Sequence, residues 1–344
     1  MFKNLKKLLL PAMALVLSLT IAGCGNSGNA DSSKESSTSG STGLKTIKIA
    51  TPGQGGVLVE NTLLAKNLGY IDEELEAAGY KAEYMGFAQA GPAINEAFAA
   101  GEIDYAVYNE LPAIMAKSNG IDLKIIAAAT QDYNYAIIAG KDSGITSAKD
   151  LAGKKVIATT GTILYKYFAD VCKANSIDIS SVELVNAQAD ANSVLASGQA
   201  DAYVTAYSAA LQLESAGTGT IIEDTTTNEE ERTGIILAAR PAVLSSDEAS
   251  AVALIKALEK AADFAKENPD KVYGYLKTDT YTEELLDKIY SYDKTFSYFD
   301  PYFTDTYRSH IENQYNFAKE NQLISNDVDL DDLIDTTYLD KAAK

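Results

Sequence analysis

This chain repeats part of itself, which restricts it to folds assembled from two similar units. The stretches INEAFAAGEIDYAVY (94–108) and ANSVLASGQADAYVT (191–205) align without gaps, and each reads as a helix, a glycine, two residues, an aspartate and a short apolar strand. A second pair, IATPGQ (49–54) and IATTGT (157–162), reads as a strand that runs into a tight turn before a helix. Because both pairs occur in the same order, we expect two βα units built alike, against the alternative of chance similarity in an alanine-rich chain.

The repeated glycines and aspartates have predictable local roles. Gly101 and Gly198 stand where the C-terminus of a helix favours a left-handed residue. Asp104 and Asp201 follow at the same spacing and are expected to cap or brace the turn into the next strand.

The alternation of apolar strands with helices predicts an α/β fold with mixed, mostly parallel sheets covered by helices on both faces. In the first unit we expect strands at 45–50, 81–86, 103–107 and 123–129, and helices near 57–68, 92–100 and 111–118. In the second we expect strands near 154–159, 182–186 and 201–205, and helices near 162–174 and 189–197. NYAIIAG (134–140) and TGIILAA (233–239) bracket the second unit and are interpreted as paired crossover strands that form a hinge.

The N-terminus has the layout of a cleaved leader. Lys3, Lys6 and Lys7 precede an apolar segment (8–22) that is interrupted by Pro11 and is shorter than the ~20 residues of a membrane span. The sequence Ile-Ala-Gly before Cys24 resembles a bacterial lipobox. We therefore expect a lipoprotein signal peptide (1–23) and then a lipidated Cys24 on a flexible Ser/Gly-rich tether (24–43). The alternative is an ordinary secretory signal with an incidental cysteine.

Charge and cysteine content narrow the class of protein further. About 300 residues remain without leader and tether, enough for two lobes with separate cores. The formal charge of −19 becomes −22 once the three leader lysines are lost, which argues against nucleic acid as a partner. Cys24 and Cys172 are the only cysteines, so no intrachain disulfide is expected, and Cys172 is predicted to be buried.

Most catalytic chemistry is hard to build from this composition. His310 is the only histidine and lies in TDTYRSHIENQ, which reads as an exposed helix. GQGGVL (53–58) lacks the last glycine of a dinucleotide fingerprint, and NDVDLDD (326–332) lacks the glycine of a calcium loop. We therefore expect no cofactor, no metal and no enzymatic activity, although catalysis by a lone lysine or tyrosine stays open.

Three loops are rich in backbone donors at the predicted carboxyl ends of strands, where ligands bind in open α/β sheets. They are TPGQGG (51–56), QAGP (89–92) and TTGT (159–162). Free N–H groups and the partial positive charge of a helix start can hold a sulfonate or carboxylate without arginine. A plain tight turn, or simple helix capping by Thr160 or Thr162, is the alternative.

Tyrosines gather at the same predicted strand ends. Because side chains alternate along a strand, Tyr105 and Tyr203 are expected to pack inside, while Tyr108 and Tyr207 follow strand ends and are expected to face a cleft. A planar or methylene-bearing ligand suits such walls.

The order of these motifs resembles a known family. FAQAGPAINEAFAAGEIDYAVYNELPAIMAKSNGIDLKIIAA, followed by SAKDLAGKKVIATTGT, is similar to the solute-binding proteins of ABC importers for nitrate, aliphatic sulfonates, taurine and thiamine-precursor pyrimidines. The resemblance covers nearly all of 45–340. It implies a two-lobed, type II periplasmic-binding-protein (Venus flytrap) fold, with lobe 1 formed by 44–132 and 235–344 and lobe 2 by 133–234.

Several positions depart from the family pattern and bear on the ligand. Ala90 replaces a small hydroxyl residue, Asn109-Glu110 replaces Gly-Asp, and Ala206-Tyr207-Ser208 replaces Trp-(Asp/Glu)-Pro, whereas Thr160-Gly161-Thr162 is similar to the family's Lys-Gly-Ser/Thr turn. Glu110 and Asp190 are expected either to accept hydrogen bonds from an amine or to be solvated or capping acids. The predicted ligand-binding residues are Gln54, Gln89, Ala90, Tyr108, Asn109 and Glu110, opposed by Thr160, Gly161, Thr162, Asp190 and Tyr207.

The resemblance implies a function in transport. We expect a monomeric bacterial lipoprotein outside the cytoplasmic membrane, tied to it by lipid alone, that passes a sulfonate- or taurine-like solute to an ABC permease and its ATPase. A pyrimidine, flavin or aromatic ligand is the first alternative. A related enzyme that uses pyridoxal phosphate and its own histidine in pyrimidine synthesis is the second, and a lipoprotein that signals to a sensor is the third.

Overall fold

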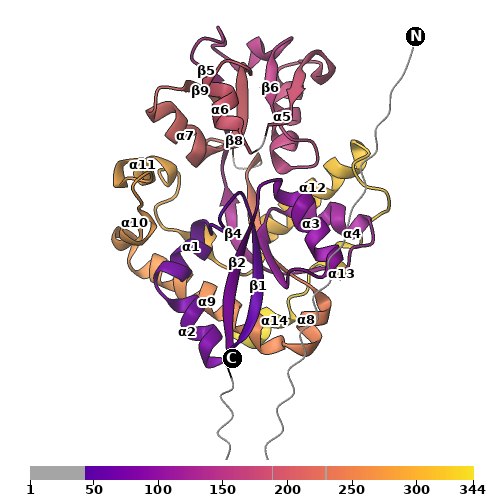
Figure 1. The fold of residues 1–344 in the computed structure, drawn as a ribbon, viewed down its shortest axis with the longest axis vertical. Coiled ribbons are helices and arrows are strands. Elements are labelled where there is room, and N and C mark those ends of the chain that lie inside the picture. Colours follow the sequence, from indigo (N-terminus) through magenta and orange to yellow (C-terminus); the bar gives the residue numbers. More distant parts are fainter. Residues whose placement is uncertain (1–42, 188, 229–230) are drawn as a thin grey trace, which may run out of the picture. The chain divides into compact units, whose positions relative to one another are not determined.

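The strands form two five-stranded mixed sheets of the same design (Figure 1). The computed structural model describes residues 43–187, 189–228 and 231–344. In each sheet three parallel strands are followed by an antiparallel strand and then by a fifth that is antiparallel to the fourth. The first sheet has the order β2 (Tyr80–Phe87), β1 (Lys45–Pro52), β3 (Tyr105–Tyr108), β10 (Thr233–Ala239), β4 (Lys124–Tyr133). The second has the order β7 (Glu183–Val185), β6 (Lys155–Ile157), β8 (Ala202–Ala206), β5 (Tyr135–Gly140), β9 (Gly219–Asp224).

The expectations for the N-terminus fall outside this part of the chain. The signal peptide, the lipidation site Cys24 and all of the tether except Gly43 belong to residues 1–42. Within the described ranges, no helix is long and apolar enough to cross a membrane.

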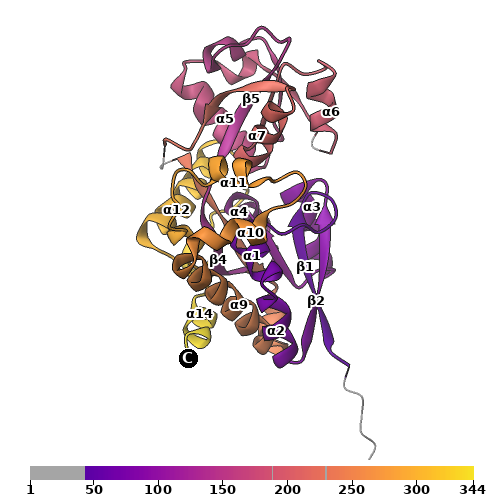
Figure 2. The same cartoon turned by 90° about the vertical axis from the view of Figure 1, so that its left-hand side faces the viewer.

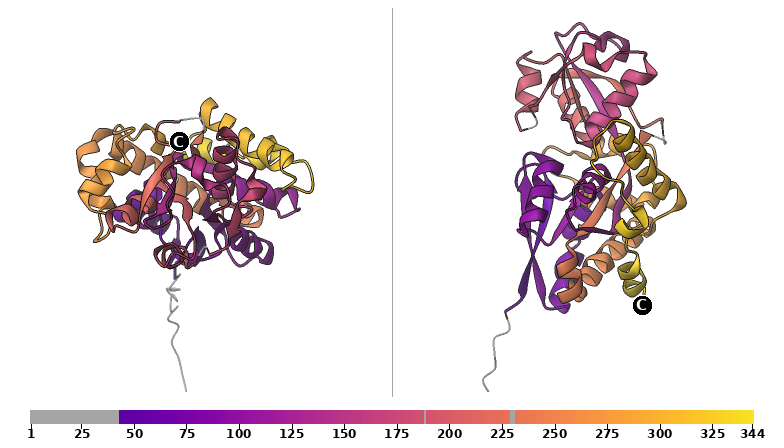
Figure 3. Two further views of the ribbon diagram at one scale, coloured as in Figure 1. Left: turned by 90° about the horizontal axis from the view of Figure 1, so that it is seen from above. Right: turned by 90° about the vertical axis from the view of Figure 1, so that its right-hand side faces the viewer.

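Helices cover both faces of each sheet, as expected (Figures 1 and 3). One core lies between the first sheet and the helices α1, α2 and α9, and a second lies on its other face, under α3, α4 and α12. Two further cores do the same for the second sheet, with α5 on one face and α6 and α7 on the other. These helices are α1 (Glu60–Asn67), α2 (Tyr70–Ala77), α3 (Ala90–Ala100), α4 (Glu110–Ser118), α5 (Ile163–Ala174), α6 (Ala191–Ala196), α7 (Tyr207–Ser215), α9 (Glu248–Glu267) and α12 (Asp305–Glu320).

The C-terminal region is helical and returns to the first sheet, as the sequence predicts. Short helices connect and follow the long ones: α8 (Pro241–Ser246), α10 (Val272–Leu276), α11 (Glu283–Ile289), α13 (Leu330–Leu333) and α14 (Thr337–Ala342). Helix α11 makes contact with α7 of the second unit, and Figure 2 shows the two side by side. The segment around α11 therefore brings residues from late in the sequence to the junction of the two sheets.

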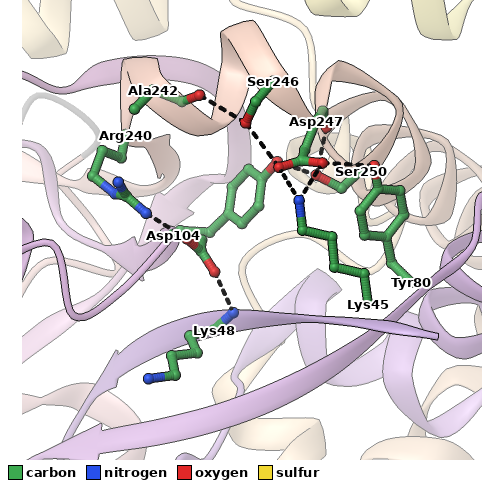
Figure 4. Close-up of polar contacts among 10 residues, drawn as sticks. Lys45, Lys48, Tyr80, Asp104, Arg240, Ala242, Ser246, Asp247 and Ser250 are labelled. Carbon is green, nitrogen blue, oxygen red and sulfur yellow. Dashed lines mark hydrogen bonds and ion pairs between the residues drawn. The ribbon is translucent and has the colours of Figure 1, made fainter. Parts of the chain in front are cut away.

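The internal repeat is confirmed in atomic detail. Gly101 and Gly198 both adopt left-handed conformations, with φ of 69° and 71°. The Asp104 carboxylate accepts a hydrogen bond from the backbone N–H of Lys48 at 2.9 Å, and Asp201 accepts one from Lys155 at 2.8 Å. Both aspartates thus brace the strand that lies beside their own. Asp104 also forms an ion pair with Arg240 at 2.7 Å (Figure 4).

Two predictions of secondary structure were incomplete. The helix expected at 57–68 is α1, and the next helix, α2, was not anticipated; Gly69, with a left-handed φ of 82°, separates the two. Helix α7 and strand β9 were not anticipated, since their sequence has neither a clear apolar period nor a turn motif.

The interpretation of β5 and β10 as paired crossover strands was wrong. Strand β5 pairs with β8 and β9 in the second sheet, whereas β10 pairs with β3 and β4 in the first. Each fills the antiparallel position of its own sheet, which a periodicity argument cannot distinguish from mutual pairing. The chain passes between the sheets at Asn134 and returns after Thr225, and the Thr225 hydroxyl donates to Asn134 Oδ1 at 2.9 Å.

Two further expectations concern single residues. Cys172 is buried, as predicted. His310 lies on a helix, as expected, but it is buried and not exposed, because it faces the core and meets the ring of Tyr307 edge-on at 6.5 Å.

Candidate functional site

A cavity of about 450 Å³ lies between the facing edges of the two sheets, at the ends of β1, β3, β4 and β8 and the beginnings of β5 and β10. This edge is where an open α/β sheet offers loops and helix starts to a ligand. The residues that line this main cavity are Thr51, Pro52, Gly53, Val57, Val59, Ala88, Ala90, Gly91, Val107, Tyr108, Asn109, Pro112, Tyr133, Tyr135, Thr162, Ile163, Leu164, Tyr203, Thr205, Ala206, Ser208, Ala209, Ile235 and Tyr281.

Four helices begin at the wall of the main cavity. Helices α3, α4, α5 and α7 start beside the lining residues Ala90, Asn109, Thr162 and Ala206. None of the four has a side-chain hydrogen bond from its N-cap residue to the first turn. Free N–H groups and the positive ends of the helix dipoles therefore lie near the cavity, which favours a negatively charged group.

Every side chain that lines the main cavity is uncharged. Its polar members are one asparagine, three threonines, one serine and five tyrosines: Asn109, Thr51, Thr162, Thr205, Ser208, Tyr108, Tyr133, Tyr135, Tyr203 and Tyr281. Recognition of a ligand here would rest on neutral hydrogen-bond donors and acceptors, on backbone amides and on aromatic rings.

The tyrosine hydroxyls in this wall are held in defined positions. Asn109 donates to the Tyr135 hydroxyl at 2.7 Å, and Tyr135 also shares a 2.7 Å hydrogen bond with Thr233. Tyr108 donates to Asn95 Oδ1 at 3.3 Å. Burial raises the pKa of Tyr108 and of Tyr133 well above the ordinary value, so these phenols keep their protons at neutral pH.

Four of the predicted ligand-binding residues line the main cavity: Ala90, Tyr108, Asn109 and Thr162. Ala90 has a φ of 50°, which is uncommon for a residue other than glycine and aims the first turn of α3. Thr162 is the N-cap residue of α5, but its hydroxyl donates to the carbonyl of Thr159 at 2.6 Å. Their roles in binding stay predictions.

The other seven predicted residues do not line it. Gln54, Gln89, Thr160 and Asp190 are exposed to solvent, and Gly161 is buried, where an added Cβ would lie 3.5 Å from the Met115 side chain. Glu110 lies behind the wall, where it accepts a hydrogen bond from the Gly234 N–H at 2.7 Å. The seventh, Tyr207, borders a smaller pocket described below.

Glu110 is fully buried, and burial raises its pKa to about 7. The phenols of Tyr135 and Tyr307, backbone N–H donors and, farther away, the Lys166 ammonium surround it. The carboxyl therefore contributes to the packing behind the cavity rather than to its surface.

Tyr203 lines the cavity, although the sequence argument placed it in the core. The reason is its register in the repeat: Asp104 corresponds to Asp201, so Tyr105 corresponds to Ala202 and Tyr203 corresponds to Ala106. Neighbouring residues of a strand face opposite sides, and Tyr203 therefore does not share the buried orientation of Tyr105.

A second, much smaller pocket adjoins the main cavity and was missed by the sequence argument. Its volume is about 10 Å³, and it shares Tyr133 and Ser208 with the main cavity. We name it the Glu60 pocket; it is lined by Glu60, Asp132, Tyr133, Asn134, Tyr207, Ser208, Ile289, Tyr290 and Tyr292. The available signal was an acidic residue directly after the apolar run GVLV, at the start of a helix.

No group of three or more acidic, histidine or cysteine side chains that could hold a metal ion occurs in the ranges 43–187, 189–228 and 231–344. The features that define the candidate site are therefore its cavity, the helix starts at the cavity wall and the tyrosines that line it.

Comparison with known proteins places the chain among two-lobed binding folds. A family model described as NMT1/THI5 like matches residues 61–272, while no curated protein sequence matches. A putative periplasmic sulfonate-binding protein SsuA from Methylobacillus flagellatus KT superposes with a TM-score of 0.68 at 23% identity, covering 87% of this chain and 94% of its own.

Two other solved structures show how widely this fold is used. The desulfurization enzyme DSZB superposes with a TM-score of 0.66 at 16% identity, covering 87% of this chain and 99% of its own. A Candida albicans protein described as having the generic periplasmic binding protein fold superposes with a TM-score of 0.64 at 12% identity, covering 86% and 97%. The predicted α/β periplasmic-binding-protein fold is confirmed, and it is a fold that serves both binding and catalysis.

Proposed function

Because this chain belongs to the NMT1/THI5-like family, we propose that it is the solute-binding lipoprotein of an ABC importer. It binds a small organic solute in the main cavity, outside the cytoplasmic membrane, and delivers that solute to a permease driven by an ATPase. The similarity in fold to a periplasmic sulfonate-binding protein supports this role.

The observation that carries the proposal is the composition of the main cavity. Both sheets supply its walls, four helices begin there, and its side chains are uncharged. A sulfonate or carboxylate would be held by backbone N–H groups from both units, which is a way to bind an anion without arginine. We therefore favour a sulfonate- or taurine-like anion or zwitterion as the solute.

Binding would proceed by closure of two lobes, 44–132 with 235–344 and 133–234. A solute that contacts loops of both sheets interacts more strongly when the loops approach, so it shifts the population toward the closed state. Asn134 and the segment after Thr225 are the two places where the chain passes between the sheets, and they are the proposed hinge. The permease would recognise the closed form.

A second class of solute is favoured by a separate observation. Five tyrosines line the main cavity: Tyr108, Tyr133, Tyr135, Tyr203 and Tyr281. Aromatic walls stack on planar rings, and a cavity of about 450 Å³ has room for one. A pyrimidine, flavin or aromatic acid is therefore the alternative ligand for the same transport role.

We propose no catalytic activity. The histidine-dependent enzyme alternative would need His310 at the ligand, yet His310 is packed in the core beside Tyr307 and is absent from the lining of the main cavity. The fold is also that of the enzyme DSZB, so this argument rests on the residues and not on the architecture.

A ligand screen by thermal unfolding tests the proposal. The purified protein would be heated with sulfonates, taurine, nitrate, amino acids, pyrimidines, flavins and aromatic acids. At 100-fold excess over Kd, a bound solute adds about 2.7 kcal/mol, or a midpoint rise of roughly 5 °C. A rise with taurine or alkylsulfonates supports the helix-start anion site, whereas a rise with ring compounds alone assigns specificity to the tyrosines. No rise with any compound contradicts the proposed role.

A further inference from the structure

The Glu60 pocket is a side chamber of the proposed ligand site. Tyr133 and Ser208 line both spaces, and Val59, the neighbour of Glu60 in the chain, lines the main cavity. Ser208 is hydrogen-bonded to the hydroxyls of Tyr133 and Tyr281, two rings of the main cavity. The Glu60 pocket and the main cavity therefore share part of their walls.

The carboxyl group of Glu60 is enclosed, and only one of its two oxygens has a hydrogen-bond partner among the described residues. Tyr290 is hydrogen-bonded to the carboxyl group, but the Oε2 oxygen is buried and accepts no hydrogen bond from any described residue. A buried acceptor without a donor destabilises the folded protein, so such an atom requires an explanation. Glu60 also has a φ of 51°, an uncommon conformation for this residue type that aims its side chain.

The surroundings of the carboxyl suit a small cation. Phenol rings of Tyr133, Tyr290 and Tyr292 line the pocket, and rings of this kind attract ammonium groups through their faces. The volume of about 10 Å³ is enough for one group the size of a water molecule. An ammonium group has that size, and it donates the hydrogen bonds that a carboxylate oxygen accepts.

The nearby arginine already has partners. Arg232 pairs with Asp132 at 3.2 Å and donates to the carbonyls of Thr225 and Thr226 at 3.3 and 2.6 Å. Its guanidinium lies over the ring of Tyr292, 4.7 Å from the ring centre. The titratable and charged groups around Glu60 are the phenols of Tyr133, Tyr281, Tyr290, Tyr292 and Tyr298 together with Asp132 and Tyr207, which also line the pocket, and Asp132 is paired with Arg232.

We propose that Glu60 binds a primary amine of the transported solute, while the anionic or ring part of that solute occupies the main cavity. This inference rests on the proposed transport function and narrows it to aminated solutes. From the sequence, Glu110 and Asp190 were the candidates for an amine, with a solvated or capping role as the alternative; in the structure the first lies behind the wall and the second is exposed.

Burial gives the pocket a pH dependence. It raises the pKa of Glu60 to about 7, so the carboxyl is largely neutral at pH 5 and charged at pH 8. An amine is protonated throughout this range. Affinity for an aminated solute should therefore increase from pH 5 to pH 8.

The test compares matched pairs of probes in calorimetric titrations of the purified protein. The first pair is taurine and propanesulfonate, and the second is benzylamine and benzyl alcohol. In each pair only the first compound carries an amine. For the class that binds, we expect the aminated member to bind about 10- to 100-fold more tightly. Glu60→Gln should remove this difference and its pH dependence, and leave the affinity for the other member unchanged.

Glu259→Gln is the matched control. Glu259 is also a partly buried glutamate with a tyrosine partner, since Tyr302 donates to it at 2.6 Å, but it lies away from both cavities. It should keep the wild-type preference for amines. The thermal midpoint of Glu60→Gln, together with its binding of the non-aminated probe, shows that the variant is folded.

Two results overturn the inference in different ways. If the wild type does not prefer the aminated member, or if Glu60→Gln keeps that preference, the amine site is wrong and the transport role stands. If no solute of the thermal screen binds the wild type, the proposed function fails, and this inference fails with it.

Discussion

Two glutamates with a buried carboxyl oxygen begin helices in this protein, and burial raises the pKa of both to about 7. A helix start favours the charged form of a carboxyl, so loss of hydration is the larger effect at both positions. In each carboxyl group one oxygen is hydrogen-bonded, to the Gly234 N–H for Glu110 and to Tyr290 for Glu60, while Oε2 is buried and accepts no hydrogen bond from a described residue. The two differ in position: Glu60 lines a pocket that adjoins the main cavity, whereas Glu110 lines neither space.

At the residue scale, Glu110 should make stability depend on pH. Its pKa is about 7 in the folded protein and 4.5 when unfolded, so its full contribution is present below pH 4.5 and is lost as pH rises through 7. The difference corresponds to about 3 kcal/mol. We expect Glu110→Gln to reduce the loss of unfolding free energy between pH 4.5 and pH 7.5 by that order, as measured by urea denaturation.

The exposed residue Glu102 provides the control for this measurement. Glu102→Gln should keep the wild-type dependence on pH. If the unfolding free energy of the wild type and that of Glu110→Gln depend equally on pH, the carboxyl of Glu110 is not the origin of the pH dependence.

At the scale of elements, both units stabilise the turn from helix to strand in the same way, but only the first adds an ion pair to it. A left-handed glycine ends a helix, and an aspartate three residues later braces the adjacent strand, in both copies of the repeat. Among the described residues, only the first copy adds an ion pair, which joins Asp104 and Arg240. The guanidinium of Arg240 also donates a hydrogen bond to the carbonyl of Ile103. Arg240 joins the end of β10 to β3 (Figure 4).

The paired aspartates therefore predict unequal costs. Asp104→Ala loses a backbone hydrogen bond and a partly buried ion pair, and we expect a loss of about 2–4 kcal/mol in unfolding free energy. Asp201→Ala loses the backbone hydrogen bond, and we expect about 1 kcal/mol. Urea denaturation of both variants checks this, and equal losses would mean that Arg240 adds nothing to the brace.

At the scale of the whole molecule, the described part has to be held outside the membrane if it is to serve a permease. The expected anchor is the lipid on Cys24, which lies outside the described residues. Cys24→Ser should move the protein from the membrane fraction to the soluble fraction, because no other attachment is expected. Cys172→Ser is the control and should stay in the membrane fraction, since Cys172 is a buried core residue. Retention of Cys24→Ser in membranes would indicate an uncleaved span.

Part of the candidate site could be predicted from the sequence, because its position depends only on neighbouring residues in the chain. A glycine-rich turn after an apolar strand places the following helix start at the edge of the sheet, whatever the rest of the chain does. Ala90 and Thr162 were predicted in this way, Asn109 was predicted from the family resemblance, and all three line the main cavity. Predicting the side of the strand on which Tyr203 lies requires the exact register of the repeat. The alignment of 94–108 with 191–205 gives that register.

The sequence by itself determined the α/β class, the repeated unit with its glycines and aspartates, and most of the strands and helices, because these depend on neighbours within a few residues. Only the tertiary structure decided which side chains face the cavity. Tyr281 and Tyr290 follow α10 and α11, late in the chain; the first lines the main cavity and the second lines the Glu60 pocket, and α11 packs on α7. A contact between residues more than two hundred positions apart depends on how the two sheets and their helices pack, and no local pattern encodes it.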